Sequence, residues 1–196
     1  MFVIVVGGTT LAKSEGVVSL KELAASPHRI GEGKLWLLIT SGVLVERPIA
    51  LSMLSFAGLA ILTLGVCGPR ILWSAALIGH IASTLLVYSA VAGYRLSEPD
   101  AFQASFAAPD YGVSAISAAW LGAVATVAWR RRTKTPATKL AIVVTCVAVG
   151  LFAWMLRGNL NVLDSEHVVA FALGIGIALG GIRIFAPRPE LDPATP

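Results

Sequence analysis

The chain has 196 residues, of which 56% are hydrophobic and 13% are charged, with a formal net charge of +4 and a mean hydropathy of +0.80. A soluble domain carries about 25% charged residues, so this composition excludes an ordinary water-facing surface. The net positive charge does not indicate a nucleic-acid partner, because the basic residues flank the apolar runs. Two cysteines, Cys67 and Cys146, exclude a disulfide scaffold and a four-cysteine metal site. The sequence predicts a polytopic membrane protein.

Five runs contain no Asp, Glu, Lys or Arg and come close to the length of about 17–25 residues that crosses a bilayer as a helix. A membrane core offers no hydrogen-bond partners to open backbone groups, so each run is predicted to be helical. The expected fold class is an all-α polytopic membrane protein, a six-helix transmembrane bundle with five spans between residues 48 and 182. Those five runs are Pro48–Pro69, Ile71–Tyr94, Tyr111–Trp129, Leu140–Leu156 and His167–Ile182.

The first span is predicted from a shorter apolar segment. Met1–Ala12 reaches only about 18 Å as a helix, so we interpret it as part of a first span that begins upstream of Met1. Residues 13–47 are expected to form an external loop, in which Leu35–Val45 is a membrane-embedded element too short to span. Residues 183–196 are expected to form a disordered cytoplasmic tail.

The orientation is predicted from the short loop between Trp129 and Lys139. It concentrates five basic residues and no acidic one, and such loops stay on the cytoplasmic side. Both chain termini are then cytoplasmic, and the loops Lys13–Arg47, Arg95–Asp110 and Arg157–Glu166 face outward. The expected location is the cell membrane, which the chain crosses several times. The five basic residues are Arg130, Arg131, Arg132, Lys134 and Lys139.

Polar residues inside spans are costly in lipid and therefore indicate functional or inter-helix roles. The spans defined above contain no carboxylate, which argues against an ion-coupled transporter. We interpret His80 as a packing or inter-helix hydrogen-bonding residue, and Tyr88 as a belt or packing aromatic. The spacing of His, Cys and carboxylate residues predicts no metal site.

Ser114 and His167 are the candidate catalytic pair. Each follows an aspartate that marks the outer end of a span, which places Ser114 about 6 Å and His167 about 4–5 Å below the boundary. A neutral histidine at that depth can accept the serine proton and return it to a leaving group. The competing interpretation is that the serine hydroxyl bonds its own helix, as serines in transmembrane helices commonly do.

Small residues line the same helical faces as this pair. Stepping by three or four residues from Ser114 and from His167 gives rows of alanine and glycine, which let membrane helices approach closely. We therefore expect the fourth and sixth spans to pack along these rows. They consist of Ala118 and Gly122 on one helix and Ala170, Gly174 and Ala178 on the other.

These features resemble the rhomboid family of intramembrane serine proteases, closest to its divergent bacterial group. The resemblance rests on six spans, Gly112-Val113-Ser114 at the head of the fourth span, and His167 at the head of the sixth. It covers roughly residues 34–182. It implies that Ser114 is the nucleophile and His167 the general base of a dyad without a third acid, acting with Gly112 in support and with no cofactor.

The sequence departs from the family pattern in ways that define the alternative function. Ala115 follows the serine where active members usually have glycine. The second span also lacks the family's His-x-x-x-Asn motif, which helps to form the oxyanion hole. Ser52 and Ser55 are therefore the candidate oxyanion donors of that span. The expected activity is cleavage of transmembrane segments of other proteins. The alternative is an inactive rhomboid-like protein that binds transmembrane helices of client proteins; a small transporter is the weaker third reading. The implied partners are a transmembrane substrate or client and the lipid bilayer, not nucleic acid.

Overall fold

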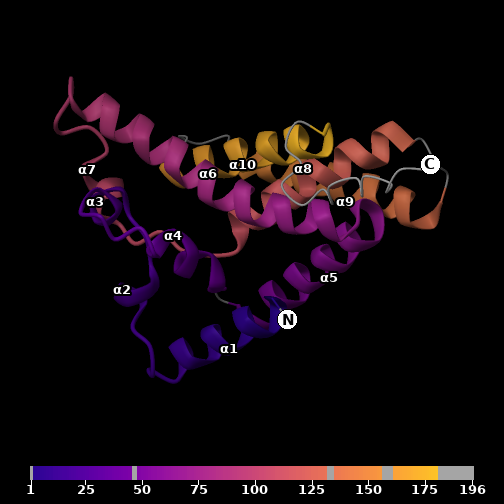
Figure 1. Ribbon diagram of the computed structural model, residues 1–196, viewed down its shortest axis with the longest axis horizontal. Helices are drawn as coiled ribbons and strands as arrows, with labels where there is room; N and C mark the ends of the chain where they lie inside the picture. The colour runs from indigo at the N-terminus through magenta and orange to yellow at the C-terminus, as the bar shows by residue number, and fades with distance from the viewer. Residues whose placement is uncertain (1, 46–47, 132–134, 156–160, 181–196) are drawn as a thin grey trace, which may run out of the picture.

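The computed structural model describes residues 2–45, 48–131, 135–155 and 161–180, and these residues fold into an all-helical structure (Figure 1). The predicted tail, residues 183–196, lies outside the described part of the chain. The elements in chain order are α1 Phe2–Ser14, α2 Leu20–Leu23, α3 Pro27–Gly31, α4 Leu37–Thr40, the short 3-10 helix η1 Ser41–Val43, α5 Ile49–Cys67, α6 Pro69–Arg95, α7 Gln103–Ala107, α8 Ser114–Arg131, α9 Pro136–Met155 and α10 Val162–Ala178.

Two helices of the described chain, α5 and α6, are long and apolar enough to cross a membrane. A tight turn joins them, in which Gly68 has φ +84° and Pro69 begins the second helix. Such a φ favours glycine because it has no Cβ, and proline suits the first turn of a helix. Half of the apolar window of α6 is buried but only 17% of that of α5. The α6 helix is therefore more extensively packed against the rest of the protein than α5.

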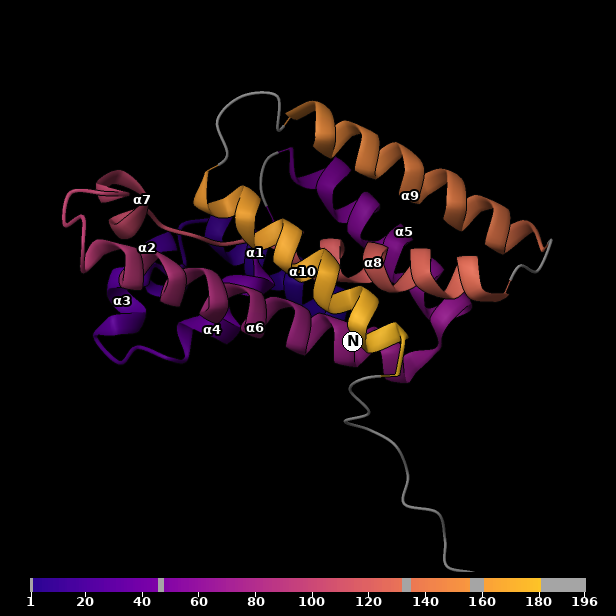
Figure 2. The ribbon, with the colours of Figure 1, turned by 90° about the horizontal axis from the view of Figure 1, so that it is seen from above.

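The centre of the structure is α8, which packs against α10, α6, α5 and α9. Trp120 is fully buried, stacks on Phe56 of α5 with ring centroids 5.0 Å apart, and donates its indole N–H to the Leu72 carbonyl of α6 at 2.9 Å. Figure 2 shows α9 at one edge of the bundle and α6 toward the opposite edge. The Trp120 side chain of α8 thus contacts both α5 and α6.

The contact between α8 and α10 depends on two glycines. A Cβ at Gly122 would overlap the Phe171 carbonyl, and a Cβ at Gly174 would overlap the Ala119 carbonyl. Both glycines are members of the small-residue rows, as is Ala170, which is fully buried. Ala178 is partly buried against the core. The two backbones meet directly where these glycines lie.

The segment that ends at Val45, before α5, is bonded to α1 through its backbone. The Val45 N–H donates to Thr10 Oγ1 of α1 at 3.1 Å. The predicted embedded element, Leu35–Val45, consists of α4 and η1, with Leu37 buried while Trp36 is 57% exposed. This element therefore has one apolar side that faces the protein and another that faces outward.

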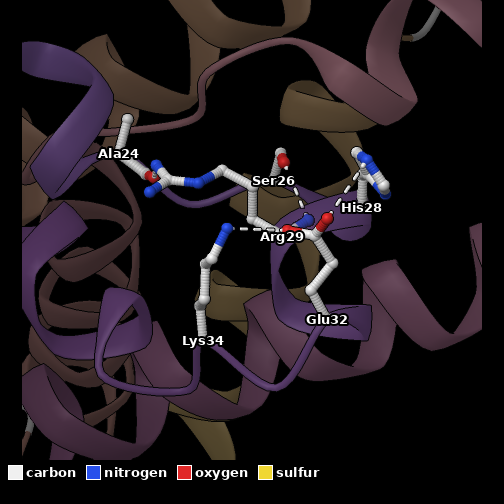
Figure 3. A network of polar contacts seen from close by, with 6 residues as sticks. All are labelled: Ala24, Ser26, His28, Arg29, Glu32 and Lys34. Atoms are coloured by element: carbon white, nitrogen blue, oxygen red, sulfur yellow. Dashed lines mark hydrogen bonds and ion pairs between the residues drawn. The ribbon is translucent and has the colours of Figure 1, made fainter.

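A network of polar contacts surrounds α3 (Figure 3). Ser26 Oγ accepts the Arg29 N–H at 3.2 Å and so caps the helix, and the Arg29 guanidinium donates to the Ala24 carbonyl at 2.6 Å. Lys34 Nζ lies 2.8 Å from a Glu32 carboxylate oxygen. The hydrogen bond and positive charge of Lys34 lower the pKa of Glu32 below its ordinary value.

The start of the last helix differs from the prediction. The sequence placed residues up to Glu166 in an external loop, and this is wrong, because α10 begins at Val162. Asn161 and Asp164 form a capping box, in which each side chain accepts a backbone N–H of the other residue at 2.8 and 3.1 Å. Such a box satisfies N–H groups that would otherwise lack partners. Glu166 is consequently a helical residue, and it is buried.

Candidate functional site

A cavity of about 650 Å³ lies between α5, α8, α9 and α10. Its walls are mainly apolar and include Phe56, Leu121, Val149 and Phe171. All five residues that the sequence singled out for catalysis and its support line this one cavity. They are Ser114, His167, Gly112, Ser52 and Ser55.

Ser114 begins α8, and the two residues before it are held in place by backbone hydrogen bonds. The Gly112 N–H donates to the Ser41 carbonyl at 2.9 Å, and the Val113 N–H donates to the Leu44 carbonyl at 3.1 Å. Gly112 has φ +132°, a conformation that residues with a Cβ rarely adopt. The Gly112 N–H is thus already engaged, and this residue supports the loop rather than offering a donor to the cavity.

The first turn of α8 provides backbone donors beside Ser114. N–H groups at the start of a helix have no acceptor within that helix, and the helix dipole favours negative charge at this end. The Ser114 side chain is exposed on the cavity side. The hydroxyl and the adjacent helix start are therefore available to one bound group.

His167 reaches the cavity from the second turn of α10. Its side chain is half-buried, and it follows the capping box that fixes the start of the helix. Ser52 and Ser55 line the cavity from α5. Ser52 is half-buried and Ser55 is exposed, so α5 contributes two hydroxyl groups in positions one helical turn apart.

One member of the small-residue rows lies in the cavity wall. Ala118 lines the cavity together with Ser114 and Ser117, whereas Gly122, one turn further along α8, meets the backbone of α10. The Ser117 hydroxyl donates to the Val113 carbonyl at 3.0 Å within its own helix. The α8 residues that line the cavity therefore all lie before Gly122, where α8 contacts α10.

Sequence reasoning missed a second set of polar residues, on the α6 side of α10. Thr84 Oγ1 of α6 lies 2.5 Å from Glu166 Oε1, and Tyr88 Oη donates to Asp110 Oδ2 at 2.6 Å. Tyr88 is 4% exposed, so of the two interpretations, belt or packing aromatic, it is the packing one. The i, i+4 spacing of Thr84 and Tyr88 was the available signal, since such residues share one helix face.

His80 lies one turn before Thr84 and joins α6 to η1. Its Nε2 is 3.3 Å from Ser41 Oγ, which confirms the inter-helix hydrogen bond expected from the sequence. Its ring fills the space beside Gly42, where an added Cβ would come within 2.7 Å of Nε2. In the described part of the chain, no three His, Cys, Asp or Glu side chains are grouped to hold a metal ion.

Comparison of the chain with protein families, with curated proteins and with solved structures gives no match.

Proposed function

We propose that this chain is a rhomboid-like intramembrane serine endopeptidase that spans the bacterial plasma membrane six times with both termini in the cytoplasm. The observation that carries the proposal is the single cavity lined by Ser114, His167, Ser52 and Ser55. These residues come from three helices, and only the fold brings them to one space. A hydroxyl, an imidazole and further hydroxyl donors are the groups that acyl transfer requires.

In the proposed reaction, His167 accepts the proton of Ser114 as Oγ attacks the carbonyl carbon of a peptide bond. The negative carbonyl oxygen is stabilised by the Ser114 N–H and by Ser52 or Ser55. His167 then donates its proton to the departing amine, which leaves an acyl group on Ser114. Water loses a proton to His167 and attacks the acyl carbon, and the serine recovers its proton when the acid product leaves.

The substrate that fits this cavity is a transmembrane segment of another protein. The apolar walls from α5, α9 and α10 match an apolar chain, and burial of apolar area favours its retention. Helical peptide bonds are hydrogen-bonded within their own segment. The cleaved segment therefore needs residues that loosen its helix, so that one bond can extend toward Ser114.

The test is labelling of the purified chain with a fluorophosphonate, which forms a covalent bond with an activated serine. We expect labelling of the native chain and none of Ser114→Ala or His167→Ala. Loss to similar extents is expected because the two residues act as a unit. Equal labelling of native and Ser114→Ala protein would exclude catalysis at this site.

A specific observation favours the alternative, a client-binding protein without activity. The α5 helix offers only serines where the resemblance leads us to expect histidine and asparagine. Loss of one oxyanion donor costs about 10²–10³ in rate. Two results together would identify the client-binding protein. The native chain would not be labelled, and a transmembrane peptide would bind in the cavity with the same affinity in the native chain and in Ser114→Ala.

A further inference from the structure

The α6 helix carries a row of buried polar residues that faces away from the cavity. His80, Thr84 and Tyr88 follow one another at intervals of four residues, and each is at most 7% exposed. Residues at this spacing lie on one helix face. The row bonds to Ser41, Glu166 and Asp110, which belong to three separate segments.

Two of these contacts lie next to the proposed catalytic residues. Glu166 directly precedes His167, and its side chain bonds to Thr84. Asp110 lies four residues before Ser114, and its side chain bonds to Tyr88. Thr84 and Tyr88 are one turn apart, so a single stretch of α6 holds the segment before Ser114 and the turn that carries His167.

Asp110 is fixed through its backbone as well as its side chain. Its N–H donates to the Ala25 carbonyl at 2.8 Å, and its carbonyl accepts the Ala25 N–H at 2.9 Å. Together with the bonds of Gly112 and Val113 described above, four hydrogen bonds besides that of Tyr88 fix Asp110, Gly112 and Val113. The path of the chain into Ser114 is therefore fixed at three of the four residues before it.

The hydrogen bonds of Thr84 indicate where a proton lies. Its hydroxyl contacts both Glu166 Oε1 and the His80 carbonyl, the latter at 2.9 Å, but a hydroxyl has one proton to donate. A proton on Glu166 resolves this, because Glu166 donates to Thr84 and Thr84 donates to His80.

We propose that Glu166 and Asp110 are positioning residues, which set the distance between Ser114 and His167 by bonding both segments to Thr84 and Tyr88 of α6. This inference rests on the proposed function for its catalytic meaning. Neither residue lines the cavity, as a reacting group would. Glu166 is buried, with its carboxyl bonded to Thr84 of α6. Their effect on catalysis passes through the geometry of the pair.

The first experiment measures the rate of fluorophosphonate labelling at increasing probe concentration. We expect Glu166→Ala and Thr84→Val to lower the limiting rate about 10- to 100-fold, as small misplacements of reacting groups do, with little change in the half-saturating concentration. Glu166→Gln and Thr84→Ser should keep rates near that of the native chain, because their amide and hydroxyl still donate. Equal rates for Glu166→Ala and Glu166→Gln would overturn the inference.

The second experiment does not depend on activity. In a chain with Cys67→Ser and Cys146→Ser, cysteines introduced as Ser114→Cys and His167→Cys are joined with bifunctional thiol reagents of graded length. We expect the shortest effective reagent to lose yield when Glu166→Ala or Thr84→Val is added, and to keep it with Glu166→Gln or Thr84→Ser. Unchanged yield in all four overturns the inference. Unlabelled native chain with this pattern of yields would overturn the proposed function alone.

Discussion

Glu166 and His167 are consecutive in sequence but serve two different regions on opposite sides of α10. On one side, His167 joins Ser114 in a cavity whose hydroxyl groups are exposed or half-buried. On the other side, Glu166 joins Thr84, and both are at most 4% exposed and hydrogen-bonded. Accessible polar groups can meet a substrate, whereas buried, paired ones hold a conformation. The comparison separates a region suited to chemistry from one suited to positioning.

The α8–α10 contact divides the two regions. Gly122 and Gly174 bring the two backbones together, and α6 packs against both helices. Figure 2 shows α6 and α9 on opposite sides of this pair. Because helix contacts are closely packed, this contact fixes the positions of α8 and α10 between the two regions.

The largest expected effect is on the cavity side. Ser52→Ala or Ser55→Ala should lower the fluorophosphonate labelling rate about 10²–10³-fold, because one of these hydroxyls is proposed to complete the oxyanion hole. Thermal unfolding of the purified variants should stay close to that of the native chain, since neither side chain is buried. If both single variants and the double variant label at the native rate, α5 supplies no oxyanion donor.

Much of the cavity side was predictable from sequence. Apolar length located α5 and α6 to within about two residues of their observed ends, because span length is set by membrane thickness. The residues Gly112, Ser114 and His167 were singled out by the spacing of polar groups and by a family resemblance. Their position around one cavity depended on the tertiary fold.

The α6 side was not predictable by the same reasoning. Charge was used to mark the ends of spans, so Glu166 was assigned to a loop, although its capping box begins the helix four residues earlier. In a helix of 3.6 residues per turn, neighbours differ by about 100° in direction, so the role of His167 says nothing about Glu166. The Thr84 partner is 82 residues away in sequence, and only packing reveals it.

A smaller effect, on the free energy of unfolding, is expected from adding a methyl group at the α8–α10 contact that separates the two regions. Gly174→Ala should destabilise the folded chain by about 1–3 kcal/mol, because its Cβ overlaps a backbone carbonyl that cannot rotate away. Gly176→Ala is the matched control in the same helix, since no atom lies within 4 Å of its added Cβ. Thermal unfolding in one detergent compares them.

The control should gain about 0.5–1 kcal/mol, as glycine-to-alanine changes in helices do. Gly174→Ala should also lower the labelling rate, whereas Gly176→Ala should not. Equal stabilities of the two variants would show that the α8–α10 contact has room for the methyl group. The two helices would then not be in the close contact that we take to separate the two regions.

The next effect is confined to the α6 side. A double-mutant cycle of Tyr88→Phe and Asp110→Ala should give a coupling energy of about 1–2 kcal/mol in unfolding, as expected for a buried hydrogen bond to an acidic group. The same cycle between Tyr88→Phe and Ser55→Ala should give no coupling energy, because residues on opposite sides of the α8–α10 contact share no partner. A measurable coupling energy between Tyr88 and Ser55 would show that the two regions are not energetically separate.

The smallest effect is expected at the Glu32–Lys34 pair, which belongs to neither region (Figure 3). Lys34 lowers the pKa of Glu32 below the ordinary 4.5, so the pair contributes stability above that pH and loses its contribution as the pH falls through the lowered value. Lys34→Met should raise the Glu32 titration midpoint toward 4.5, measured by carbon NMR of the labelled carboxyl. Because both side chains are exposed, water and salt screen the pair, and neither the labelling rate nor the unfolding temperature at neutral pH should change. A fall in labelling rate in Lys34→Met, with the Glu32 midpoint unmoved, would mean that the segment around α3 affects the site by a route other than this ion pair.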